Sequence, residues 1–187
     1  ARLVIQEMAD ALALDLVDKG LVTNQLVLTV GYDRENLDDF SRAAQYHGPI
    51  ITDRYGRKIP KHAVGTENFP YTSSARDLLR AVTALFDRIV DPNLLIRRLS
   101  ISANKLLDEA SAVREPQAEQ LDLFTDYAAR KKQEQADEAV HARERKIQET
   151  MLGIKKRYGK NAILKGMNLE DGATGRERNE TIGGHHA

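Results

Sequence analysis

The chain has 187 residues, enough for one domain of ordinary size with extensions. It contains no cysteine, which excludes a disulfide framework, a thiolate zinc site and a cysteine nucleophile, and no apolar run reaches the roughly 20 residues that cross a bilayer. The formal net charge is zero, with 28 basic and 28 acidic residues, so nucleic-acid binding would need a local basic patch.

The first predicted element is a helix over residues 1–19. Apolar residues recur there at four-residue steps, Lys19 lies in the last turn, and Gly20 follows as a stop. The periodic, charge-bearing start also does not resemble a signal peptide. A strand follows over residues 26–33, because large apolar side chains recur there at every second position.

The next segment is polar and irregular over residues 34–48. A hairpin is predicted after it, since residues 49–60 flank a turn at 53–56. Residues 63–69 then predict a further strand, which Pro70 ends.

A second helix is predicted after this strand. Ser73 or Ser74 caps it, and Asp77 stands three residues after Ser74, as in a capping box. Pro92 separates the helix from a last strand over residues 94–103.

The order of these elements predicts an α+β fold, with two helices on one face of an antiparallel or mixed sheet. The order matches a βαββαβ unit whose first strand is missing. That strand would lie just before Ala1, so we expect the sequence to be a piece of a longer chain. The predicted domain spans residues 1–107.

The composition changes after this domain. Residues 108–125 are acidic and polar, as in a linker. Residues 126–158 are dense in Ala, Glu, Lys, Arg and Gln, which predicts a long charged helix. Residues 159–187 are rich in glycine and polar groups, which predicts a flexible tail that becomes ordered only with a partner.

No catalytic or metal site is predicted. The sequence has no Walker loop, no serine elbow and no dinucleotide glycine fingerprint, and its carboxylates form no acidic pair at an apolar strand end. His185 and His186 offer at most an adventitious metal site, and a solvated tail is the favoured interpretation. We therefore expect neither a cofactor nor enzyme activity in this chain.

Basic residues gather at the predicted hairpin and the last strand. Residues 48–66 carry four Lys or Arg against one acid. Basic side chains on strands can contact phosphates, and the scarcity of aromatic residues favours phosphate contacts over base stacking. A solvated hairpin explains the charge equally well. The candidate DNA-binding residues from this pattern are Arg54, Arg57, Lys58, Lys61, His62, Arg97 and Arg98.

A short apolar motif, Gln120-Leu121-Asp122-Leu123-Phe124, interrupts the acidic linker. Burying a Leu or Phe side chain is worth roughly 1.5–3 kcal/mol, so three exposed large side chains are costly without a partner. Such a peptide suits a groove on another protein. The alternative is a hydrophobic staple that opens the long helix, and we favour the docking peptide.

This motif resembles the sliding-clamp-binding motif at the C-termini of bacterial polymerases. The resemblance implies that Gln120, Leu121, Leu123 and Phe124 fill the clamp pocket. Asp122 is part of the same clamp-binding motif, and we expect its side chain to face solvent.

The preceding part resembles the little finger domain of Y-family translesion DNA polymerases. The similar segments are residues 7–10, 20–22, 27–32, 61–66, 71–74 and 96–101. Residues 158–167 and 178–185 resemble the ultraviolet-damage-repair branch of that family in Gram-positive bacteria.

The resemblance implies a module that holds primer-template DNA by its phosphates and tethers a polymerase to the bacterial sliding clamp, in DNA repair and the SOS response. It implies DNA contacts by Lys61, His62, Thr66, Arg97 and Arg98. Arg54, Arg57 and Lys58 lie in residues 49–60, which look like an insertion relative to the commonest pattern of the family.

The catalytic palm of that family has no counterpart in this sequence. Its carboxylates hold two magnesium ions, so we expect magnesium in a catalytic part outside this chain, in a cytoplasmic protein. The alternative function is a non-enzymatic adaptor that binds the clamp or RNA and regulates replication. A purely coiled-coil protein is a further alternative, but the apolar stripe of residues 126–158 is too short for sustained heptads.

Overall fold

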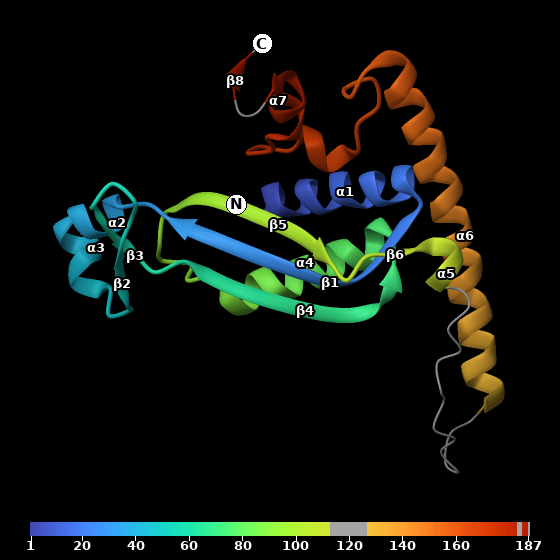
Figure 1. Ribbon diagram of the computed structural model, residues 1–187, viewed down its shortest axis with the longest axis horizontal. Coiled ribbons are helices and arrows are strands. Elements are labelled where there is room, and N and C mark those ends of the chain that lie inside the picture. Colours follow the sequence, from blue (N-terminus) through green and yellow to red (C-terminus); the bar gives the residue numbers. More distant parts are fainter. Residues whose placement is uncertain (113–126, 183–184, 187) are drawn as a thin grey trace.

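The computed structural model describes residues 1–112, 127–182 and 185–186 (Figure 1). The helices are α1 (Arg2–Lys19), α2 (Glu35–Asp38), α3 (Phe40–Gln45), α4 (Ala75–Ile89), α5 (Glu109–Ala112), α6 (Tyr127–Tyr158), the 3-10 helix η1 (Gly166–Leu169) and α7 (Gly175–Glu180). The strands are β1 (Leu21–Tyr32), β2 (Ile50–Thr52), β3 (Lys58–Pro60), β4 (Ala63–Thr72), β5 (Ile96–Asn104), β6 (Leu107–Asp108), β7 (Thr181–Ile182) and β8 (His185–His186).

The main sheet is antiparallel, with the order β4-β1-β5, and β6 pairs with the start of β1. In its register, Val30 of β1 lies between Ala63 of β4 and Leu99 of β5. The α+β prediction is confirmed. β2 and β3 form a separate hairpin, in the place where the sequence predicts one.

Both α1 and α4 cover the same face of this sheet. Every second residue of β1 from Leu26 to Tyr32 is buried against them, because successive side chains of a strand point to opposite faces. The helices contribute Ile5, Ala9 and Leu78 to the same core. The opposite face of the sheet is not covered by these helices and carries mainly small polar side chains, with Val27 and Val64 among them.

Helices α1 and α4 begin and end where the sequence predicts. Gly20 stops α1 in the left-handed region, at φ 65°, where glycine has no steric cost. Ser74, rather than Ser73, caps α4: its hydroxyl accepts the Asp77 amide at 3.2 Å.

Strand β4 continues past Pro70 to Thr72, whereas the sequence predicts that this proline ends it. β4 is an edge strand, and the register of its pairing with β1 shifts between Asn68 and Thr72. Proline has no backbone N–H to donate to a neighbouring strand, and at an irregular position of an edge strand no such donor is required, which explains why the strand tolerates it.

Residues 34–48, predicted to be irregular, contain the short helices α2 and α3. The Asp39 carboxylate caps α3 by accepting the amides of Ser41 and Arg42 at 2.9 and 3.0 Å. Asn36 is fully buried, and its side-chain amide donates to the Leu95 carbonyl at 3.0 Å, which ties α2 to the segment before β5.

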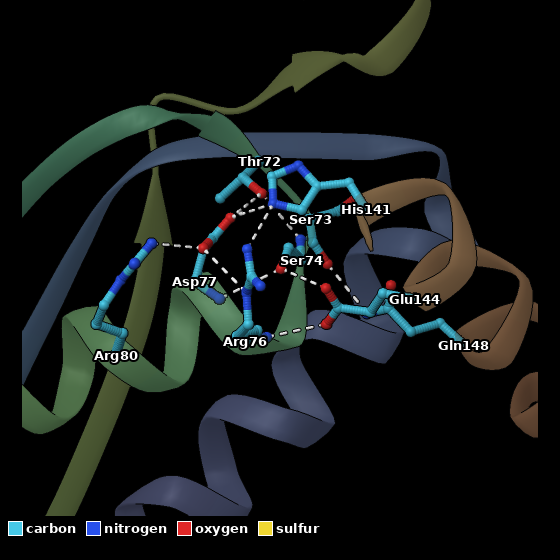
Figure 2. Close-up of polar contacts among 9 residues, drawn as sticks. All are labelled: Thr72, Ser73, Ser74, Arg76, Asp77, Arg80, His141, Glu144 and Gln148. Carbon is cyan, nitrogen blue, oxygen red and sulfur yellow. Dashed lines mark hydrogen bonds and ion pairs between the residues drawn. The ribbon is translucent and has the colours of Figure 1, made fainter. Parts of the chain in front are cut away.

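Helix α6 stands at the end of the sheet away from the hairpin (Figure 1). It is attached to the start of α4 by polar side chains (Figure 2). The Glu144 carboxylate accepts the Ser74 hydroxyl at 2.7 Å and the Arg76 amide at 2.9 Å. The buried Gln148 amide donates to the Ser73 carbonyl at 3.1 Å.

The C-terminal segment differs from the flexible tail that its glycines predict. Residues 159–182 fold back over α1 and include η1 and α7 (Figure 1). A buried carboxylate, Glu7 of α1, accepts the Gly175 amide at the start of α7 at 3.0 Å. Glycine content alone did not predict this order, because the ordering groups come from α1.

None of the helices in the described ranges is long and apolar enough to cross a membrane.

Candidate nucleic-acid interface

The face of the sheet opposite α1 and α4 is mostly uncharged. Small polar residues of neighbouring strands lie side by side on it, for example Thr29 opposite Ser100 and Gln25 opposite Asn104. Thr66, a predicted DNA contact, is exposed on this face and pairs with Val27. We call this surface the open face.

One end of the open face is basic. There the β2–β3 hairpin stands beside the sheet, and together they line a cleft of about 640 Å³. The basic side chains that line it are Arg54, Arg57, His62, Arg97 and Arg98. The structure thus brings together residues that lie up to 44 positions apart in the sequence.

Much of this charge is not neutralised within the protein. Among the described residues, Arg54, Arg97 and Arg98 form no ion pair with a carboxylate, whereas Arg2 on the helical side pairs with Asp87 at 3.0 Å. Unpaired guanidinium groups remain available to an external anion.

Arg57 is the partial exception. Its guanidinium contacts Asp53 at 2.7 Å, and this side-chain hydrogen bond lowers the pKa of Asp53 to about 2. Asp53 is therefore ionised at neutral pH and offsets the Arg57 charge, while it holds the arginine in place. The cleft keeps a net positive charge from its remaining arginines.

Gly31 of β1 lies beside two of these basic groups. A Cβ atom at this position would lie 3.4 Å from the Cβ of Arg98 and 3.6 Å from Nδ1 of His62. Both distances are ordinary van der Waals contacts, so Arg98 and His62 lie next to the central strand without requiring a glycine there.

Three predicted DNA contacts do not line the cleft: Thr66, which lies on the open face, and Lys58 and Lys61. Lys58 lines a separate hollow with Arg34, Tyr46 and Arg57, and Arg57 also lines the cleft. Lys61 has an exposed side chain, and its amide donates to the Pro49 carbonyl at 2.8 Å, closing the hairpin.

Tyr55 is a cleft residue that the sequence analysis did not select. Its position in the turn between Arg54 and Arg57 could have identified it in the sequence. Its place beside the open face, however, depends on how the hairpin packs.

The motif at residues 120–124 lies outside the described residues, between the end of α5 at Ala112 and the start of α6 at Tyr127. Clamp binding by Gln120, Leu121, Leu123 and Phe124 stays a prediction.

Within the parts of the chain that the structure describes, no three His, Asp or Glu side chains lie close enough to hold a metal ion.

Comparison with known proteins gives one match. The model of the impB/mucB/samB family C-terminal domain matches residues 1–123, which include the main sheet, the helices α1 and α4 that cover it, and the hairpin. No curated protein matches the chain, and no solved structure matches it.

Proposed function

The chain belongs to the impB/mucB/samB family and carries the non-catalytic C-terminal domain of a Y-family polymerase, and from this premise we propose that its open face holds primer-template DNA by the phosphates. The observation that carries the proposal is the group of unpaired arginines at the end of an otherwise uncharged open face.

The chemistry of the open face favours binding without base preference. Arginine forks pair with phosphate oxygens, and small hydroxyl and amide side chains such as Thr29, Thr66 and Ser100 add hydrogen bonds along the backbone. Contacts to phosphates carry little sequence information, which suits a polymerase that works on damaged templates.

The test is the salt dependence of duplex binding by the full chain. If the cleft arginines engage phosphates, log K falls with log salt by roughly 0.9 per phosphate, and changing Arg97 and Arg98 to Ala should flatten the slope by about two such contacts. The measurement is fluorescence anisotropy of a labelled duplex at several salt concentrations.

A matched control removes the same charge at the far end of the molecule. Arg143 and Lys146 are exposed on α6, so changing both to Ala should leave the slope as in wild type. An equal effect of both double variants would mean that only overall charge matters, and salt-independent binding would contradict the proposal.

We also propose that residues 120–124 dock into the bacterial sliding clamp and tether the polymerase to it. Support comes from the motif itself and from the polymerase family of the chain. Leu123 and Phe124 are the anchors, because burying each is worth roughly 1.5–3 kcal/mol. Gln120 sets the register through its side-chain amide.

Calorimetric titration of purified clamp tests this proposal. Changing Leu123 and Phe124 to Ala should abolish a micromolar complex, whereas Asp122→Ala should bind as wild type does. Equal affinity of the double variant would favour the hydrophobic staple instead. DNA binding should persist in every variant, because the two sites share no residues.

The polymerase chemistry and its magnesium belong, in this proposal, to a catalytic part outside this chain, in a cytoplasmic DNA-repair enzyme. The purified chain should then extend no primer when supplied with magnesium and nucleotides, and extension would overturn this assignment. The family match favours this function over an adaptor that binds the clamp or RNA.

A further inference from the structure

The tip of the β2–β3 hairpin carries an aromatic side chain between two arginines. Tyr55 is 65% exposed. The Cζ atoms of Arg54 and Arg57 lie 4.7 and 4.9 Å from the centre of its ring. Arg54 also donates to the Tyr55 hydroxyl at 2.6 Å. The tip therefore presents flat aromatic and guanidinium surfaces, with positive charge around them.

This arrangement is held by the backbone of the turn. The Asp53 carboxylate accepts the amides of Tyr55 and Arg57 at 2.8 and 3.0 Å, and the Asp53 amide donates to the Arg57 carbonyl at 2.9 Å. Gly56 completes the turn at φ 77°, which glycine adopts without strain. Tyr55 is thus exposed at a defined place, and its exposure is a property of the folded turn.

The position of the tip relates it to the proposed DNA site. Tyr55 lines the same cleft as Arg97, Arg98 and Ser100 of β5. DNA on the open face would therefore bring nucleotides past the Tyr55 ring.

The kind of DNA that this tip can bind follows from its flat surfaces. The bases within a duplex are stacked on one another, so their faces are not free to contact a side chain. Unpaired bases do offer their faces, and they stack on aromatic rings and on arginine planes. A phosphate contact alone would need the arginines but not an exposed ring between them.

We propose that the hairpin tip binds unpaired nucleotides of single-stranded DNA that continue from the duplex on the open face. Tyr55 stacks on a base, Arg54 contacts the adjoining phosphate, and Arg57 stays fixed by Asp53 as part of the stacking surface. This proposal rests on the proposed function, since it extends the same DNA site into a single-strand contact.

The test compares a blunt duplex with the same duplex carrying a single-stranded extension, both bound by the full chain and measured by fluorescence anisotropy. Wild type should bind the extended duplex more tightly. Tyr55→Ala should weaken binding to the extended duplex about 10-fold, near the lower end of the range for one base stacked on an aromatic ring, and should weaken binding to blunt duplex by a clearly smaller factor.

A second variant separates stacking from the hydroxyl contact. Tyr55→Phe keeps the ring and loses only the bond to Arg54, so it should bind the extended duplex nearly as wild type does. Tyr55 lies outside the core, so both variants should keep the wild-type circular dichroism and melting temperature.

Three outcomes would overturn the inference. Equal losses on blunt and extended duplex would make the tip an ordinary duplex contact. An unchanged affinity of Tyr55→Ala for the extended duplex would remove the stacking role, and the proposed function would still stand if Arg97→Ala and Arg98→Ala weaken duplex binding. Failure of wild type to bind either DNA would overturn the proposed function as well.

Discussion

Glu7 is a carboxylate buried beneath the C-terminal segment, with a side chain 1% exposed. Its oxygens accept the Asn168 side-chain amide at 2.7 Å, the Thr174 amide at 2.9 Å and the Gly175 amide at 3.0 Å, and Arg178 lies at 3.1 Å. Burial raises the pKa of Glu7, but these donors outweigh it, so the pKa lies below its usual 4.5. The ionised form therefore holds the segment against α1.

This pKa predicts how acid affects the docking of residues 159–182. Because the pKa in the folded state is lowered, the contribution of Glu7 is fully present above the usual value of 4.5 and is lost as the pH falls through the lowered value. The Gly175 amide resonance, followed by NMR as the pH falls, should shift with that single titration.

Substitution tests the same carboxylate at neutral pH. Glu7→Gln should weaken docking by about 1.5–3 kcal/mol, the usual worth of hydrogen bonds to a charged group, and should abolish the acid-dependent shift of Gly175. Asp15→Asn on the same helix removes only an exposed pair with Lys19 and should change stability by less than about 1 kcal/mol. A Glu7→Gln protein that still titrates would assign the effect to another group.

At the scale of elements, the fit of α4 on the sheet depends on a glycine. A Cβ atom at Gly65 of β4 would lie 2.7 Å from Cδ1 of Leu85 and 2.8 Å from Cγ2 of Ile89. Both side chains belong to α4, so the helix lies closer to β4 than any larger residue would permit.

Gly65→Ala should therefore destabilise the fold by about 1–3 kcal/mol, the usual cost of overpacking. The control is Gly153→Ala in α6, where nothing lies within 4 Å of the added Cβ, and where loss of a helical glycine should stabilise by about 0.5–1 kcal/mol. Chemical denaturation measures both, and equal effects would contradict the packing argument.

Some helices and strands could be predicted from the sequence alone, and others could not. Periodicity and caps predict α1, β1, α4 and β5, because each buries an apolar face that repeats along the chain. The helices α2 and α3 are too short for such a repeat and depend on Asn36 and Asp39. The Asn36 contact that holds α2 is tertiary, whereas the Asp39 cap of α3 is local but is not an apolar repeat.

The same division applies to the candidate site. Clustered charge in the sequence identified Arg54, Arg57, Arg97 and Arg98, which the structure gathers around one cleft. The role of Tyr55 depends on the packing of the hairpin against the end of the sheet, and no spacing in the sequence encodes that contact.

At the scale of the whole molecule, α6 supplies a carboxylate that caps the N-terminus of α4. The Glu144 carboxylate occupies the helix N-terminus, where amide donors and the helix dipole favour negative charge (Figure 2). Arg145 pairs with Glu109 of α5 at 2.8 Å, so the two helices are joined to the domain and to each other.

Glu144→Ala should lower stability by about 1–2 kcal/mol, as for the loss of a helix cap, and should leave DNA affinity unchanged because the cleft lies at the other end of the sheet. Glu138→Ala, an exposed change on the same helix, should fall within about 0.5 kcal/mol of wild type. Thermal unfolding distinguishes them, and equal melting temperatures would mean that α6 adds no stability through this carboxylate.

The Arg145–Glu109 pair affects how freely the domain could move while the proposed clamp peptide is bound. Glu109 lies in α5, before residues 113–126, and Arg145 lies in the middle of α6, after them, so the pair joins the two helices that flank the proposed clamp peptide in the sequence. A loop held at both ends explores less space than a tail of equal length, so the domain would swing less about a bound clamp. Cleaving the chain on one side of the motif would keep the residues that contact the clamp and would let the domain move farther from a bound clamp.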